Sequence, residues 1–310
     1  MSRAPEVAVL VNAAAGRGRG ARAVPAVTAA LAGAGVTPVL LTATSRADAE
    51  RLAAAAVADG VAAVAALGGD GAAHAVLQAV AGTTTALALL PSGTGNDLAH
   101  ALGVPADPVA AARAVAVDVL SGVRRRVDAA RTGDRWWGTV LCCGFDSAVT
   151  DRANRLPWPR GPRRYDVAVL AELARLRPRE LALTVDGVGQ QLLVTMISVA
   201  NTAWYGGGLQ IAPGADPADG LLDVVVVGPV SRRELARTRP RLAAGTHVQH
   251  PAVTVLRGRE VRLDGDGPTT YADGESVSAL PAVSVCVPGA VAVVGTGRRP
   301  PSHEDGHLRR

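Results

Sequence analysis

The sequence predicts two domains: an α/β domain with a parallel sheet over residues 1–122, and a mainly antiparallel β domain over residues 123–297. Two observations lead to this prediction. In the first part of the chain, unbroken apolar runs alternate with helical stretches, a pattern typical of parallel strands covered on both faces. Further along, short β-prone runs are separated by turn signals, which favours antiparallel pairing. Residues 298–310 form a polar tail.

The elements of the first domain follow from its apolar periodicity. Four apolar runs predict buried strands, and the Ala-rich segments between them predict helices. Ser45 with Asp48 is a capping-box signal at the start of one of these helices. A further helix is expected over residues 108–117. The predicted strands are 7–11, 36–41, 61–67 and 86–90, and the predicted helices are 21–34, 45–59 and 72–81.

The elements of the second domain are predicted from short aliphatic runs and tight-turn dipeptides. Asp186-Gly187 and residues 264–267 are typical hairpin turns. Two segments have helical character, at 166–176 and 231–242. The predicted strands are 139–143, 181–185, 192–199, 221–227, 253–256, 261–263, 283–287 and 291–294.

The composition indicates a globular protein of a reducing compartment. The chain has 310 residues, 48% of them hydrophobic, which is enough for two separate cores. Its cysteines, Cys142, Cys143 and Cys286, lack the spacing of a disulfide framework. The first apolar run is too short for a signal sequence, and no aliphatic stretch is long enough to cross a bilayer. These features predict a cytoplasmic protein.

Two glycine turns stand where a predicted strand runs into a predicted helix. They are Gly68-Gly69-Asp70-Gly71 and Gly93-Thr94-Gly95-Asn96-Asp97. Such a turn exposes backbone N–H groups at the positive end of a helix, and the missing side chains let phosphate oxygens approach. Each turn also carries an acid that can hold a nucleotide-bound magnesium ion. One such turn is common without any ligand, but two of them, each with an acid, favour a triphosphate site. Because the sequence contains no lysine, the cation at the phosphates must be arginine or a metal ion.

Together with the later Asp273-Gly274-Glu275, these turns resemble the motifs of bacterial lipid kinases of the diacylglycerol kinase type, a family that includes the sphingosine kinases. Further matches are Asn12 to Gly16, Gly144-Phe145-Asp146 and residues 205–223, and the resemblance covers most of residues 7–295. Gly-Gly-Asp-Gly is shared with NAD kinases and phosphofructokinases. The family's usual threonine after this motif is Ala72 here.

The resemblance implies a fold like that of NAD kinases and diacylglycerol kinases, with ATP bound on the two glycine turns between the domains. It assigns Asp70 and Asp97 to catalysis and, with Asp128, to the magnesium ion and its waters. Glu275 becomes the general base toward the lipid hydroxyl, with Asp273 orienting it. The position of Thr44 is loose, because an ungapped match falls on Ala43. The implied nucleotide contacts are Asn12, Gly16, Thr44, Gly68, Gly69, Asp70, Gly71, Gly93, Thr94, Gly95 and Asn96.

Some of these residues also fit a purely structural role. Asp128 follows three arginines and fits an ion pair equally well, and Asn96 also fits a helix cap. Without the resemblance, Glu275 would be interpreted as a solvated acid in a hairpin.

The loop 215–221 resembles one that holds a structural magnesium ion in relatives. The matching ligands are Asp219 and the backbone carbonyls of Asp216 and Leu221. Acids beside a glycine suit oxygen coordination of a hard cation. An Asx turn leading into the next strand explains the same residues, and both interpretations stay open.

The resemblance implies an ATP- and magnesium-dependent lipid kinase of phospholipid metabolism, which converts diacylglycerol to phosphatidic acid. The alternatives are a kinase of sphingoid bases or other long-chain alcohols, an NAD kinase, and a non-catalytic lipid-binding protein. The second glycine turn and Asp273-Gly274-Glu275 argue against the NAD kinase.

A kinase of a bilayer lipid must reach the membrane, so we expect peripheral membrane association. The segment 152–165 carries arginines around Trp158, which suits an anionic lipid surface, although an arginine-rich connecting loop explains it too. The net charge of +5 is compatible with such a surface. Nucleic-acid binding is not expected, because the chain lacks the basic–aromatic stacking motifs of nucleic-acid-binding proteins. The resemblance further implies a homodimer and a C-terminal tail that returns to the first domain. The arginines of the segment are Arg152, Arg155, Arg160, Arg163 and Arg164.

Overall fold

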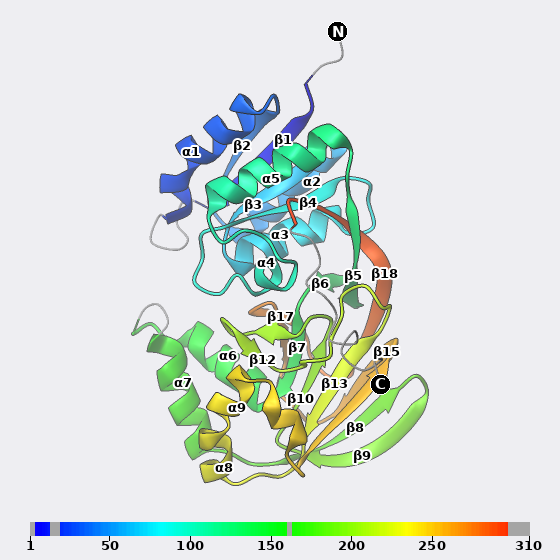
Figure 1. Ribbon diagram of the computed structural model, residues 1–310. Coiled ribbons are helices and arrows are strands. Elements are labelled where there is room, and N and C mark those ends of the chain that lie inside the picture. Colours follow the sequence, from blue (N-terminus) through cyan, green and yellow to red (C-terminus); the bar gives the residue numbers. More distant parts are fainter. Residues whose placement is uncertain (1–3, 13–18, 160–162, 297–310) are drawn as a thin grey trace, which may run out of the picture. The chain divides into compact units, whose positions relative to one another are not determined.

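The computed structural model describes residues 4–12, 19–159 and 163–296 (Figure 1). The chain divides into two compact units, one from the described parts of Met1–Arg126 and Val291–Arg310 and one from Val127–Ala290. The sequence placed the division near residue 123 and gave residues 291–294 to the second domain, whereas here they belong to the first unit. An apolar run does not reveal which sheet it joins, because that depends on its pairing partner. The polar tail lies outside the described residues.

The first unit is built on a parallel sheet. Its strands are β1 (Glu6–Asn12), β2 (Thr37–Ala43), β3 (Ala63–Gly68), β4 (Ala86–Pro91) and the end of β18 (Ala282–Val294). Their order is β2-β1-β3-β4-β18, and each neighbouring pair runs parallel. The sheet therefore has the parallel character that the unbroken apolar runs predict.

Helices cover both faces of this sheet. α1 (Arg19–Gly33) and α5 (Pro108–Ser121) pack on one face, where Val27 and Leu31 of α1 meet alternate residues of the strands. α2 (Arg46–Ala58) and α3 (Asp70–Val80) pack against each other and against β1 and β3. Successive residues of a strand point to opposite faces of the sheet, so the same apolar strands contact both pairs of helices. The carboxyl ends of β3 and β4 then lie side by side in register, with Gly68 opposite Pro91.

The second unit contains a six-stranded antiparallel sheet in the order β14-β13-β10-β7-β16-β17. One face of this sheet packs against a second layer formed by β15, β8 and β9. Aliphatic side chains of both layers form one buried cluster. The predicted antiparallel β domain is thus confirmed. The bounds are β7 (Val140–Gly144), β8 (Arg179–Val185), β9 (Val188–Val194), β10 (Met196–Ala200), β13 (Leu222–Val227), β14 (Val253–Gly258), β15 (Glu260–Gly265), β16 (Thr270–Ala272) and β17 (Glu275–Ser278).

Smaller elements complete the second unit. β5 starts at the end of the first unit and pairs with both β6 and β18, and β11 with β12 forms a short ribbon. α6 and α7 pack against each other, as Figure 1 shows in green. The bounds are β5 (Arg125–Thr132), β6 (Arg135–Trp137), β11 (Trp204–Tyr205), β12 (Leu209–Gln210), α6 (Phe145–Arg155), α7 (Arg163–Ala174), α8 (Arg232–Arg237), α9 (Arg239–Ala243) and the 3₁₀ helix η2 (Thr246–Gln249).

Several elements differ from the sequence prediction. α6 was not predicted, because its sequence is polar and its position is fixed by Gly144, whose φ of 105° suits a glycine. The expected strand 192–199 is divided at Thr195, which donates from its N–H and its hydroxyl to the carbonyls of Val227 and Gly228. The expected helix 231–242 is two short helices that meet at Thr238. The runs 283–287 and 291–294 are parts of the one strand β18.

Candidate active site

The two glycine turns lie against each other at the carboxyl ends of β3 and β4. The carbonyl of Gly68 accepts hydrogen bonds from the N–H groups of Ser92, at 2.8 Å, and Gly93, at 3.2 Å. A Cβ added to Gly93 would lie 2.4 Å from the Cα of Gly69, and one added to Gly95 would lie 2.4 Å from Oδ2 of Asp70. Real Cβ atoms do not approach so closely, so these glycines are needed for the packing of one turn on the other.

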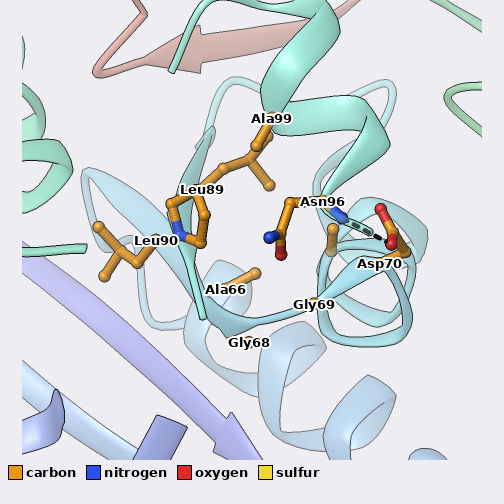
Figure 2. A pocket seen from close by; sticks show the side chains of 10 residues that line it. Ala66, Gly68, Gly69, Asp70, Leu89, Leu90, Asn96 and Ala99 are labelled. Atoms are coloured by element: carbon orange, nitrogen blue, oxygen red, sulfur yellow. Dashed lines mark hydrogen bonds between the residues drawn. The ribbon is translucent and has the colours of Figure 1, made fainter. Parts of the chain in front are cut away.

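Asp70 joins the first turn to the helix after the second turn, α4 (Asp97–Ala101). Its carboxylate accepts a hydrogen bond from the N–H group of Asn96 at 2.9 Å (Figure 2). It also accepts one from the N–H group of Asp97 at 2.7 Å. These are N–H groups at the start of α4, so Asp70 caps that helix from a distant part of the sequence. The residue assigned to magnesium thus also holds the second turn in place.

Asn96 occupies the cap position itself but does not cap with its side chain. It adopts a left-handed conformation with φ of 61°. Its Oδ1 accepts from the N–H of Gly93 at 3.1 Å, and its Nδ2 donates to the carbonyl of the same residue at 3.2 Å. The alternative of an ordinary side-chain helix cap is therefore wrong, and the amide closes the turn on itself.

Each glycine turn has an exposed residue. Thr94 is exposed at the tip of the second turn, and Gly71 is exposed in the first turn of α3. A small cavity of about 10 Å³ lies between the turns, bordered by Gly68, Gly69, Asp70 and Asn96 (Figure 2). Asp97 is 9% exposed. Within the described ranges, no group of three or more His, Cys, Asp or Glu side chains gathers as a metal cluster.

The remaining predicted nucleotide contacts lie at the ends of β1 and β2. Asn12 ends β1 opposite Ala43, and Gly16 falls outside the described residues. Thr44 is exposed and donates from its N–H, at 2.9 Å, and its hydroxyl, at 3.1 Å, to Oδ2 of Asp48. This N–H and Arg51 lower the pKa of Asp48. The side chain of Ser45 accepts from the N–H of Asp48, which is one of the two hydrogen bonds of a capping box. In the other bond, the side chain of Asp48 accepts from the N–H of Thr44 and not from that of Ser45.

In the second unit, Glu275 stands at the start of β17, directly after a two-residue hairpin turn. Asp273 and Gly274 form this turn with φ of 52° and 83°, the signature of an Asp-Gly hairpin. The carboxylate of Asp273 accepts from the N–H of Gly138, at 3.0 Å, and from the N–H, at 2.9 Å, and hydroxyl of Thr139. Asp273 therefore anchors the turn that carries Glu275, which agrees with an orienting role.

Asp128 has a different environment from the one that the sequence predicted. The residue is 5% exposed, and its carboxylate accepts from the N–H groups of Gly220 and Gly289, both at 2.7 Å. Its backbone N–H and carbonyl bond to Pro217 and Asn201. These contacts hold the carboxylate of Asp128 in place within the second unit. Its role toward the magnesium ion stays a prediction.

The loop 215–221 forms the Asx turn that the sequence left open as an alternative. Oδ1 of Asp219 accepts from the N–H of Leu221 at 2.9 Å, and Oδ2 pairs with the guanidinium of Arg257. The same guanidinium lies 3.4 Å from Oδ2 of Asp223, whose pKa is raised by burial. An arginine of the chain thus supplies positive charge to this loop, and the carbonyl of Asp216 accepts from the N–H of Asp219.

The sequence gave no role to two acids of α6. Asp146 accepts a hydrogen bond from the hydroxyl of Tyr205 at 2.9 Å, and burial raises its pKa to about 6. Asp151 accepts from the hydroxyl of Tyr271 at 2.8 Å, and burial together with Asp151 raises the pKa of Tyr271 to about 12. The signal for Asp146 was present, because Gly144-Phe145-Asp146 is a third glycine and acid at a strand-to-helix junction.

Comparison with known proteins identifies the family. Residues 6–132 match the diacylglycerol kinase catalytic domain, and residues 139–295 match the YegS C-terminal NAD kinase beta sandwich-like domain. The chain is 41% identical over 295 residues to a diacylglycerol kinase of Mycobacterium tuberculosis, covering 93% of this chain and 94% of that protein. The chain belongs to the diacylglycerol kinase family of lipid kinases. The resemblance stated from the motifs is therefore confirmed.

A second relative supports the family, and a solved structure supports the fold. The chain is 33% identical over 260 residues to a probable YegS-like lipid kinase of Stenotrophomonas maltophilia, covering 79% of this chain and 82% of that protein. A crystal structure of a diacylglycerol kinase from Bacillus anthracis superimposes with a TM-score of 0.72 at 18% identity, covering 96% of this chain and 99% of that one. The α/β and β fold expected from the sequence is confirmed, and this protein is a lipid kinase.

Proposed function

We propose that this lipid kinase transfers the γ-phosphate of ATP to the free hydroxyl of diacylglycerol and releases phosphatidic acid. The observation that carries this proposal is the anchored hairpin that presents Glu275, combined with 41% identity to a protein named diacylglycerol kinase. Phosphoryl transfer requires neutralised phosphate charge, an aligned acceptor hydroxyl and a group that takes its proton. The two units each supply part of this chemistry.

The first unit supplies the nucleotide end of the reaction. ATP phosphates would contact the backbone of the glycine turns and the hydroxyl of Thr94, which is exposed there. The acids offer only oxygen ligands, which is the donor set that magnesium prefers. When bound, the ion would neutralise charge on the phosphates. Asp97 and Asp70 would hold it.

The second unit supplies the acceptor end of the reaction. Glu275 would accept the proton of the lipid hydroxyl as the oxygen attacks the γ-phosphorus and the bond to the leaving ADP oxygen breaks. Asp273 cannot easily take this role, because its carboxylate already accepts three hydrogen bonds. We assign Asp273 the role of holding the turn in place and Glu275 the role of accepting the proton of the lipid hydroxyl.

The lipid must be reached at a membrane surface, and the second unit carries a surface of the right character. Trp158 is 79% exposed, and α7 exposes Leu170, at 67%, together with Val167 and Val169. Arg155 and Arg163 flank these apolar side chains, a combination that suits the interface of an anionic bilayer. Arg160 lies outside the described residues. No helix in the described ranges is long and apolar enough to span a bilayer.

The decisive experiment follows labelled γ-phosphate from ATP into lipid. Wild type with diacylglycerol and Mg²⁺ should give labelled phosphatidic acid. Glu275→Gln should lower kcat about 100-fold or more at unchanged melting temperature, because a general base contributes that much. Asp97→Asn should also lose activity. Glu180→Gln changes an exposed carboxylate of β8 and is the matched control.

The compound that receives the labelled phosphate distinguishes between the alternative functions. Label in a sphingoid base or another long-chain alcohol, but not in diacylglycerol, would keep the mechanism and change the substrate. Phosphorylation of NAD without labelled lipid would contradict the proposal. ATP binding without transfer to any acceptor would favour a non-catalytic lipid-binding protein.

A further inference from the structure

The hairpin that carries Glu275 lies at the edge of the six-stranded sheet. β17 is the last strand in the order of that sheet and pairs with β16. The pairing of these two strands shifts register between Thr270 and Tyr271, which is a β-bulge. Bulges at sheet edges turn side chains away from the regular alternation. The direction of Glu275 therefore also depends on the side-chain contacts that fix the hairpin.

Two side-chain hydrogen bonds connect α6 to this hairpin. The hydroxyl of Tyr271 in β16 donates to Oδ1 of Asp151 at 2.8 Å. Nδ2 of Asn154 donates to the carbonyl of Gly274 in a longer bond of 3.4 Å. Asp151 and Asn154 are three residues apart, so they lie on the same side of the helix. α6 thus contacts both the strand that leads into the turn and the turn itself.

The start of α6 is fixed to the middle of the same sheet, which makes the helix a firm support. The N–H of Phe145 donates to the carbonyl of Thr195 at 3.1 Å. The buried hydroxyl of Ser147 accepts from the N–H of Gly144 at 3.0 Å and donates to its carbonyl at 3.1 Å. A Cβ added to Gly144 would lie 2.7 Å from the carbonyl oxygen of Thr195, so the two backbones pack directly on each other.

Tyr271 suits a supporting role because its hydroxyl remains a donor at neutral pH. The residue is 8% exposed. Burial and the bond to Asp151 raise the pKa of Tyr271 to about 12, and the charge of Glu275 contributes to the increase. Tyr271 therefore stays protonated and does not compete with Glu275 for the proton of the acceptor hydroxyl. The influence of Glu275 on this pKa also shows that its carboxylate lies near the phenol.

We propose that Tyr271 and Asp151 are positioning residues, which hold the hairpin of Glu275 in the orientation that phosphoryl transfer requires. Asp273 fixes the turn to the segment before β7, and the pair of Tyr271 with Asp151 fixes the hairpin to the helix after β7. The inference rests on the proposed role of Glu275 as the base and adds two residues to the same site. Neither of them exchanges a proton with the substrate.

The test compares two tyrosines that each donate to an acid of α6. Tyr271→Phe removes the bond to Asp151 and keeps the ring. It should lower kcat about tenfold with the KM for ATP unchanged, because a small displacement of a catalytic group lowers the rate by up to about 100-fold. Tyr205→Phe removes the matched bond to Asp146, at 2.9 Å, and should leave kcat unchanged. Melting temperatures verify that both variants are folded.

A double variant distinguishes positioning from a general loss of active protein. Because Tyr271 acts through Glu275, Tyr271→Phe should cause no further loss when it is added to Glu275→Gln. The residual transfer of labelled phosphate measures this. A further loss of the same size in the Glu275→Gln background would overturn the inference, because a residue that acts elsewhere affects both backgrounds equally.

Two substitutions of Asp151 test the partner of Tyr271. Asp151→Ala removes the acceptor and should match Tyr271→Phe. Asp151→Asn keeps an oxygen that accepts from the tyrosine hydroxyl and removes the exposed ion pair with Arg155, so it should restore most of the activity that the alanine variant loses. Equal loss in the asparagine and alanine variants would overturn the role of the hydrogen bond.

The activity of Glu275→Gln separates the two proposals. If Glu275→Gln loses activity while Tyr271→Phe keeps the kcat of wild type, this inference alone is overturned. If Glu275→Gln keeps full activity, the proposed role of Glu275 is overturned and this inference with it.

Discussion

The glycine turns of the first unit and the Asp-Gly turn of the second unit use glycine for different physical reasons. In the first unit, a Cβ on Gly93 or Gly95 would collide with the facing turn at 2.4 Å. In the second unit, a Cβ on Gly274 would meet nothing within 4 Å, and the residue is a glycine because φ is 83°. One site therefore depends on backbone contact between two segments, and the other depends on local conformation.

The largest expected effect follows from this difference. Gly93→Ala should lower the free energy of unfolding by about 3 kcal/mol, since the facing backbone cannot give way without moving a strand end. Gly274→Ala should lower it by only about 1 kcal/mol, the cost of a left-handed alanine. Urea unfolding of both variants measures the difference. Equal losses would mean that the two turns do not pack as closely as the structure indicates.

Each turn is also anchored by an acid, which gives the next prediction. Asp70 accepts from two backbone N–H groups, and Asp273 accepts from two N–H groups and a hydroxyl. Asp70→Asn and Asp273→Asn should each lower stability by about 2 kcal/mol, because charged hydrogen bonds to backbone donors are lost.

The two variants should differ in kinetics. Asp70→Asn should raise the KM for ATP, whereas Asp273→Asn should lower kcat with the KM for ATP unchanged. Steady-state kinetics with varied ATP gives both values. The opposite pattern would exchange the roles assigned to the two units.

A smaller effect depends on pH and concerns Asp146 in the second unit. Burial raises its pKa from 3.8 to about 6. The unfolded chain then loses the proton at lower pH than the folded one, so stability falls as the pH rises from about 4 to about 6. Relative to Asp146→Asn, which does not titrate, wild type should lose about 1 kcal/mol per pH unit in this window and nothing above it. Urea unfolding across this range measures the slope, and parallel curves would contradict it.

The smallest expected effect concerns metal removal. Because Asp219 already pairs with Arg257 and with the N–H of Leu221, we expect chelation of divalent ions to leave the melting temperature unchanged. Activity should still require Mg²⁺. A clear drop in melting temperature with a chelator would support a structural cation at the loop 215–221, and Arg257→Gln would show whether the arginine competes with it.

The fold and the two glycine turns could be predicted from sequence because their signals are local. Apolar runs gave the parallel strands, and glycine with an adjacent acid marked each turn. The Asp-Gly turn before Glu275 was equally visible. The dihedral requirements of a hairpin and the apolar pattern of a buried strand depend on consecutive residues, so they can be recognised without knowing the fold.

The bonds made by each acid could not be predicted in this way. Asp70 at the start of α3 caps α4, whereas Asp128 within β5 binds the N–H groups of Gly220 and Gly289, and these partners all lie far away in the sequence. α6 was missed because its sequence is polar on average, and its few apolar residues, Val149 and Ala153 among them, pack against Ala168 of α7.

The sequence by itself determined the two kinds of sheet, the two glycine turns and the Asp-Gly-Glu hairpin, and these motifs carried the resemblance to lipid kinases. Local conformation and strand burial are properties of neighbouring residues, and they remain in the sequence as patterns. Only the tertiary structure decided that Gly93 packs on Gly69, that Arg257 pairs with Asp219, and that Arg152 and Arg155 line a cavity with Glu172. Those contacts join residues far apart in the chain, so no local pattern encodes them.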